Sequence, residues 1–223
     1  MAEAKKVEAF IKAVDSQFFD AFINEGEVCM NTLQWFRDYE FENSEIGDKY
    51  EGATFAKEND VTISMAPNGR PELFKVLTNK AKDTCIYDSR ENGNILSLYT
   101  ILGGADIHYI PNKFIDEFNH HRFCLITAPG LFLEKLYSEI EQHRHTADTL
   151  LVKYLTPNGA WSPFYKREKY LYQNETRVFL KDPNACMQVF KIGSMKNFAF
   201  EIFPQKLMYK ISDGKELIIT TED

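Results

Sequence analysis

The 223-residue sequence lacks the patterns that mark secreted, metal-bound and membrane proteins. No run approaches the roughly 20 apolar residues of a membrane span, and the N-terminal MAEAKKVEAFIKAV lacks the apolar core of a secretion signal. The cysteines are few, lie among apolar neighbours and form no C-x-x-C pair, which favours free, buried thiols in a reducing compartment. We therefore expect a cytoplasmic protein that does not enter a membrane. The four cysteines are Cys29, Cys85, Cys124 and Cys186.

Several chemical signatures are also missing. The chain has no G-x-S-x-G motif, no dinucleotide-binding glycine pattern and no P-loop, which argues against those routes to hydrolysis or nucleotide binding. Its five histidines include His120-His121 and His143-x-His145, but neither set has a nearby cysteine. We therefore expect no metal site.

The charge balance disfavours broad nucleic-acid binding. The net charge is −7, whereas such binding relies on Lys and Arg to neutralise phosphates. The segment 153–172 nevertheless mixes lysines with tyrosines and resembles a stacking-plus-phosphate surface, so an RNA-binding module stays an alternative. The plainer interpretation is that its aromatic residues lead into a strand while its charges face water.

What the sequence does contain is typical of one folded unit. Hydrophobic residues make up 44% of the chain and charged residues of both signs 26%, and a chain of this length buries roughly 70% of its unfolded surface. Short alternating segments rich in β-branched and aromatic residues predict strands. The sequence thus predicts a single α+β domain over 1–223, with a mixed, mostly antiparallel sheet and three or four helices.

Three segments have the apolar spacing of helices. The first covers 7–18, with Val7, Phe10, Ile11 and Val14 on one face. The second follows a short strand at 26–30 and places Trp35 and Phe36 on its inner face. The clearest lies at 131–143.

The acidic, polar segment 40–51 predicts an exposed surface loop. Within it, Asp48 and Glu51 are expected to be solvated and to change stability little when replaced. A negative loop of this kind favours a basic protein partner.

One polar row stands out late in the chain, at Gln173-Asn174-Glu175-Thr176-Arg177. On a strand, alternation puts Gln173, Glu175 and Arg177 on one side. By pattern alone this row favours a solvated face with a Glu–Arg pair; the second interpretation is a cleft in which the row acts on a ligand.

The triplet Gln173-x-Glu175 resembles the Q-x-E motif of the ADP-ribosyltransferase superfamily, which carries the catalytic glutamate on a late strand. The order of that family, a basic residue early, a Ser- or Tyr-bearing strand in the middle and the glutamate late, is matched by Arg37, Ser97 and Tyr99, and Glu175. The chain also resembles a loose group of bacterial and phage proteins with GD-x-x-EG and Q-x-E-x-R motifs, here Gly47 to Gly52 and Gln173 to Arg177.

The transferase resemblance implies a split sheet and NAD as co-substrate, in an active enzyme or a catalytically degenerate relative associated with phage or bacterial defence. Glu175 would stabilise the ribosyl cation and Gln173 would hold the acceptor. Arg37, Ser97 and Tyr99 would bind the dinucleotide, with Arg37 clamping its phosphates. The alternative from a different class is a non-enzymatic, acidic interaction or inhibitor protein that uses the loop 40–51.

Overall fold

A computed structural model describes residues 6–39, 47–57, 91–182, 184–202 and 218–221, and the backbone alone at 61–65, 75–81, 207–210 and 216–217. The elements of its first half are β1 (Val7–Asp15), α1 (Phe19–Glu25), β2 (Glu27–Thr32), α2 (Leu33–Tyr39), β3 (Phe55–Lys57), β4 (Val61–Met65), β5 (Lys75–Ala81), β6 (Gly93–Leu102), β7 (Ile107–Ile110) and α3 (Asn112–Glu117). Those of the second half are β8 (His121–Ile126), α4 (Pro129–Gln142), β9 (Ala147–Leu151), β10 (Lys153–Leu155), β11 (Asn158–Ala160), β12 (Tyr165–Arg167), the 3₁₀ helix η3 (Glu168–Gln173), β13 (Glu175–Lys181), β14 (Gln188–Lys191), β15 (Ala199–Ile202), β16 (Leu207–Lys210) and β17 (Glu216–Thr221).

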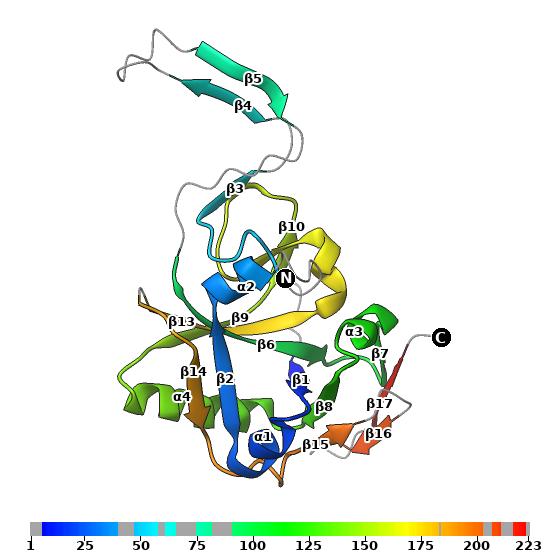
Figure 1. Cartoon of the computed structure of the whole chain (residues 1–223). Helices are drawn as coiled ribbons and strands as arrows, with labels where there is room; N and C mark the ends of the chain where they lie inside the picture. The colour runs from blue at the N-terminus through cyan, green and yellow to red at the C-terminus, as the bar shows by residue number, and fades with distance from the viewer. Residues whose placement is uncertain are drawn as a thin grey trace.

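An eight-stranded antiparallel sheet lies at the centre, in the order β14-β2-β6-β1-β8-β15, with β13 and β9 added beside β6 (Figure 1). The predicted mixed and mostly antiparallel character is confirmed, since only the β10–β12 and β17–β7 pairs among the described strands are parallel. The described residues form four α-helices besides η3. None of these helices is long and apolar enough to cross a membrane.

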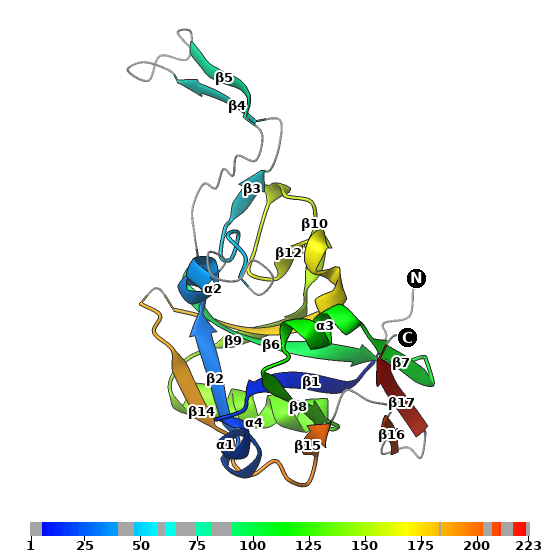
Figure 2. The ribbon, with the colours of Figure 1, turned by 45° about the vertical axis from the view of Figure 1, so that its right-hand side comes forward.

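The two faces of the sheet are covered by different elements. Leu96 and Leu98 of β6 pack with Phe132 and Leu136 of α4 in the largest apolar cluster. On the opposite face, Tyr99 packs with the α3 residue Phe114 and its neighbours. Helix α2 and the segments 47–57 and 158–173 also cover this second face, which Figure 2 shows above the sheet.

The first predicted helix is a strand, so that prediction is wrong. β1 is a central strand, paired with β6 on one edge and β8 on the other. Phe10 and Val14 enter the cluster on one face, and Ala9 and Ile11 enter that on the other. A strand buried on both faces loses its polar alternation, and its apolar residues then imitate helical spacing.

The second predicted helix exists as α2, but of the two residues predicted on its inner face only Phe36 packs inward, against the cluster of Leu33, Ile95 and Phe179. Leu33 and Arg37, four residues apart, are its buried residues. Trp35 is 40% exposed and stacks on Tyr39 of the same helix, with ring centroids 4.6 Å apart. Because residues at i and i+4 share a helix face, burying Leu33 and Arg37 turns Trp35 outward.

Most of the remaining predicted elements are present. The clearest helix is confirmed as α4, with Phe132, Leu136 and Ile140 buried. Among the cysteines, Cys124 is buried as expected, whereas Cys29 and Cys186 are exposed, and Cys85 lies outside the described residues. Apolar sequence neighbours did not ensure the burial of Cys29, because adjacent residues of β2 point to opposite faces, and Cys186 lies outside the strands.

Candidate functional site

The candidate site begins with the pairing of β6 and β13. These antiparallel strands place Arg177 opposite Ser97 and Glu175 opposite Tyr99. Because side chains alternate along a strand, all four of these residues point away from the α4 face of the sheet. The predicted same-face placement of Glu175 and Arg177 is confirmed. Gln173 comes from η3 instead, one residue before the left-handed turn at Asn174.

The sheet divides at this place. On the edge opposite β13, β6 pairs first with β2, where Asn31 faces Ile95, and then with β1, where Ile11 faces Tyr99. Between Ile95 and Tyr99 no described strand pairs with this edge, and β1 and β2 run apart (Figure 2). The ammonium of Lys12 donates to the Ser97 carbonyl there, at 3.2 Å.

Glu175 is buried and held by three donors. Ser97 Oγ and Arg177 Nε both donate to Oε1, each at 2.5 Å, and Lys166 Nζ lies 2.9 Å from Oε2. Burial alone would raise the pKa of Glu175, but the charges of Arg177 and Lys166 and the hydrogen bonds lower the pKa to about 2. The carboxylate is therefore ionised across the physiological range.

Gln173 completes this corner of the site. Its Oε1 accepts a 2.6 Å hydrogen bond from Lys166 Nζ, and its Nε2 lies 3.4 Å from Glu117 Oε2 of α3. Lys166 thus bridges Gln173 and Glu175, the two residues of the Q-x-E triplet. The solvated face favoured by pattern alone is wrong, because Gln173, Glu175 and Arg177 are all buried.

The expected exposure of Asp48 and Glu51 is also wrong. Glu51 pairs with Arg177 through both oxygens, and Asp48 Oδ1 accepts from Arg167 Nε at 3.0 Å. Burial raises the pKa of Glu51, and the pairing with Arg177 opposes that rise. The two carboxylates are buried because they neutralise arginines beneath them, so they do not present charge to a basic partner. Residues 40–46 of the same predicted loop lie outside the described residues.

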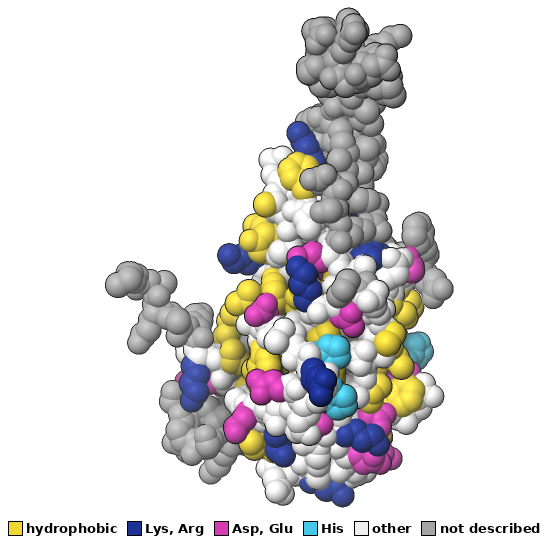
Figure 3. Space-filling view, turned by 90° about the vertical axis from the view of Figure 1, so that its left-hand side faces the viewer, with side chains coloured by type: hydrophobic (Ala, Val, Ile, Leu, Met, Phe, Trp, Pro, Cys, Tyr) yellow, Lys and Arg dark blue, Asp and Glu magenta, His cyan; other side chains and the backbone are white. Residues whose placement is uncertain are grey.

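The predicted aromatic surface of 161–172 is buried in part. Trp161 and Tyr170 are core residues, and the Tyr170 hydroxyl donates to the Gly47 carbonyl at 2.6 Å. These rings hold the segment 47–57 over the sheet and do not form a stacking platform for bases. On the face in Figure 3, acidic and basic side chains are interspersed.

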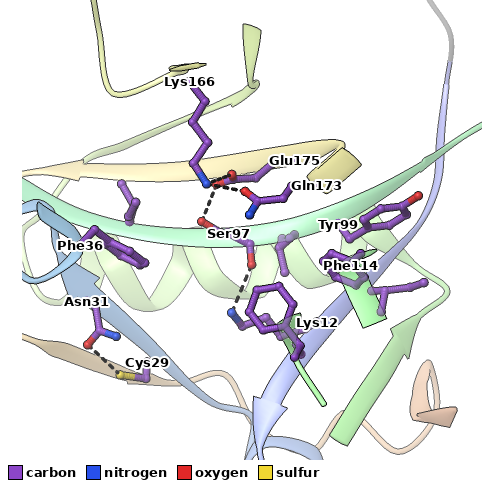
Figure 4. A pocket seen from close by; sticks show the side chains of 15 residues that line it. Lys12, Cys29, Asn31, Phe36, Ser97, Tyr99, Phe114, Lys166, Gln173 and Glu175 are labelled. Carbon is purple, nitrogen blue, oxygen red and sulfur yellow. Dashed lines mark hydrogen bonds and ion pairs between the residues drawn. The ribbon is translucent and has the colours of Figure 1, made fainter. Parts of the chain in front are cut away.

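Four of the five residues predicted for the NAD site line one pocket, at the place where the sheet divides (Figure 4). They are Ser97, Tyr99, Gln173 and Glu175. Arg37 does not line it: its guanidinium donates to the Glu51 carbonyl at 2.9 Å and to Gln34 Oε1 at 2.5 Å. The pocket holds about 110 Å³, below the roughly 300–1,000 Å³ of sites that enclose a whole ligand. Its volume would enclose only part of a larger ligand.

Sequence reasoning missed several residues of the pocket. Lys12 was assigned to a helix, and Lys166 was taken as an outward charge of the aromatic segment. Asn31 and Cys29 of β2 also line the pocket, as do the rings of Phe36, Phe114 and Phe118. No local signal pointed to them, because β1, β2, α2 and α3 converge only through tertiary packing.

Comparison with family models, curated proteins and solved structures found no match to this chain. The described residues hold no group of three or more His, Cys, Asp or Glu side chains arranged to bind a metal ion.

Proposed function

We propose that this chain is an ADP-ribosyltransferase-like enzyme that cleaves the nicotinamide–ribose bond of NAD, with Glu175 as the catalytic residue. The observation that carries the proposal is the convergence of Ser97, Tyr99, Gln173 and Glu175 on one pocket. Ser97 and Tyr99 lie on β6, whereas Gln173 and Glu175 lie about 75 residues later, on η3 and β13. A solvated strand face would not place the polar side chains of these separate elements around one pocket.

The contacts of Glu175 leave it able to receive a substrate. A carboxylate has about four lone-pair positions. Two on Oε1 are used by Ser97 and Arg177, and one on Oε2 by Lys166. No described side chain uses the fourth position, on Oε2, and we assign this position to the ribose 2′-hydroxyl as hydrogen-bond donor.

The bond cleavage follows from these charges. As the C1′–N bond breaks, its electron pair leaves with nicotinamide and positive charge develops on the ribose. An ionised carboxylate beside that ring stabilises the charge, as in glycoside cleavage. Water or an acceptor group then attacks C1′ and releases a proton. Gln173 supplies an amide beside Glu175 for orienting the acceptor.

Two further features support the proposal. The separation of β1 and β2 along β6 supports the proposal, because a split sheet is expected of a transferase of this type. The aromatic walls and the small volume suit the nicotinamide ring, while the remainder of the dinucleotide would lie outside the enclosed part. The phosphate-clamping role expected of Arg37 has no support from its position.

The direct test is release of nicotinamide from NAD by the wild-type protein, alone and with candidate acceptors, followed by chromatography. Glu175→Gln removes the charge and keeps the shape, and we expect a loss on the order of a hundredfold or more. Because this variant also leaves buried cations less compensated, Ser97→Ala provides a milder second variant. Wild-type protein that neither binds NAD, measured as a thermal shift at millimolar concentration, nor turns it over would exclude the proposal.

A further inference from the structure

Lys12 occupies an unusual position in the sheet. It is the first residue of β1 beyond the last described pair with β6, Ile11 opposite Tyr99. Its ammonium donates to the Ser97 carbonyl, which lies where no described strand pairs with that edge of β6. This contact uses one of the three donors of the ammonium. The other two have no hydrogen-bond partner among the described residues, and Lys12 lines the wall of the pocket.

Positive side chains outnumber negative ones among the residues that line the pocket. Its charged lining residues are Lys12, Lys166 and Glu175. Glu175 is already balanced by Lys166 and by Arg177 behind it. Lys12 forms no ion pair with the described carboxylates, and its hydrogen-bond partner is a neutral carbonyl. The pocket lining therefore carries one positive charge more than Glu175 neutralises, although the whole chain has a net charge of −7.

A partly desolvated cation needs a counter-charge. Burial lowers the pKa of Lys12, and the nearby Cys29 and Glu175 only partly oppose that effect. A ligand anion that paired with the Lys12 ammonium would offset the free-energy cost of burying its charge. Glu175 is the described carboxylate that acts on Lys12, and it is already paired with Lys166 and Arg177.

Four of the residues that line the pocket are aromatic, Phe36, Tyr99, Phe114 and Phe118, and they lie among aliphatic side chains such as Ile11 and Ile95. Phe36 stands on one side and Tyr99 with Phe114 on the other, and Lys12 lies across β6 from Lys166 and Glu175 (Figure 4). The Tyr99 and Phe114 ring centroids are 4.7 Å apart, so they form one continuous apolar wall. A flat ring fits such walls, with polar groups at its rim.

We infer that this pocket binds a small aromatic carboxylate, whose ring packs between Phe36 and Phe114 and whose carboxylate pairs with Lys12. The inference concerns binding and does not require NAD cleavage. If the proposed function also holds, free aromatic acids are inhibitors that compete at the nicotinamide end of the site.

A purely structural role for Lys12 makes a different prediction. If Lys12 only supports the Ser97 carbonyl, Lys12→Gln should change stability but not the charge preference of the pocket. The matched variants are Lys12→Arg, which keeps the charge, and Lys196→Gln, which removes an exposed lysine elsewhere.

Nicotinate and nicotinamide are suitable probes because they share the ring and differ in charge. Occupancy can be read without any activity from Cys29, an exposed thiol that lines the pocket. Its alkylation by iodoacetamide is followed by mass spectrometry, with the exposed Cys186 as internal reference. Burial raises the pKa of the Cys29 thiol, so the reaction is run at mildly alkaline pH.

We expect nicotinate to protect Cys29 at concentrations about tenfold or more below those of nicotinamide, the scale of one hydrogen bond to a charged group. Lys12→Gln should abolish the difference, while Lys12→Arg and Lys196→Gln should keep it. Acetate should protect at least about tenfold less well, because it lacks the ring.

Equal protection by nicotinate and nicotinamide, or by neither, overturns the inference, as does a Lys12→Gln variant that retains the preference. Equal protection by acetate overturns the aromatic part of the assignment. Failure here is distinct from failure of the proposed function, because nicotinamide release from NAD by wild-type protein is measured separately.

Discussion

Arg177 and Glu51, 126 residues apart in sequence, form a two-point ion pair in the protein interior. Nη1 of Arg177 lies 2.7 Å from Oε2 of Glu51, and Nη2 lies 2.5 Å from Oε1. The ion pair connects the segment 47–57 to β13. Arg177 also pairs with Glu175, so Glu51, Arg177 and Glu175 form one network. The residues of the GD-x-x-EG and Q-x-E-x-R motifs therefore meet in one buried network.

Breaking this pair should destabilise the protein strongly. Glu51→Gln leaves the buried Arg177 with only part of its counter-charge, and we expect the free energy of unfolding to fall by about 3–5 kcal/mol. Urea unfolding followed by circular dichroism measures the change. The control is Glu25→Gln, which breaks an exposed pair with Lys191 and should cost less than about 1 kcal/mol. Equal effects of the two variants would contradict the buried pair.

Glu175 should make stability depend on acid pH. Its pKa falls from 4.5 to about 2 on folding, so its ionised form contributes stability that is full above 4.5 and lost as the pH drops toward 2. The shift corresponds to on the order of 3 kcal/mol. Because the pKa of Glu51 is raised, that residue acts in the opposite direction. Comparing wild type with Glu175→Gln isolates the Glu175 contribution; identical pH profiles would disprove it.

Trp35→Ala should be mild, contrary to what the sequence suggested. The ring is 40% exposed and rests on Tyr39, so we expect a loss of about 1 kcal/mol or less. Phe132→Ala, which empties a fully buried site under the sheet, should cost about 3–5 kcal/mol. Thermal or urea unfolding of both variants provides the comparison. A large loss for Trp35→Ala would show that its exposed face is covered.

Ser97→Ala should reduce nicotinamide release while the protein stays folded. The hydroxyl donates to Glu175 Oε1, and a hydrogen bond to a charged group contributes about 1.5–3 kcal/mol. A loss of roughly tenfold to a hundredfold in kcat is expected if the bond orients the carboxylate in the transition state. Unchanged kcat with unchanged unfolding would remove Ser97 from the proposed mechanism.

Arg37→Met should affect folding and not the pocket. The guanidinium holds the Glu51 carbonyl and Gln34, so its loss should lower the free energy of unfolding by about 1–3 kcal/mol. Protection of Cys29 by nicotinate should stay as in the wild type. A loss of that protection in folded variant protein would return Arg37 to the ligand site.

Several strands, one helix and part of the candidate site could be predicted from the sequence alone. Alternating apolar residues predicted most of the strands, and the spacing in 131–143 predicted α4, because these patterns reflect contacts within single elements. The Q-x-E triplet with Ser97 and Tyr99 also pointed to four residues that do line one pocket. Such predictions succeed where a residue's position follows from its own strand or helix.

Only the tertiary structure decided the rest. Whether β1 is a helix or a strand depended on its having neighbours on both edges, which bury both of its faces. Whether Asp48 and Glu51 face water or the interior depended on Arg167 and Arg177, more than a hundred residues away. Lys12 reaches the pocket because β1 and β2 separate along β6. The burial of a charge and the lining of a pocket are properties of distant partners, and a local sequence pattern carries no information about which partners will be brought close.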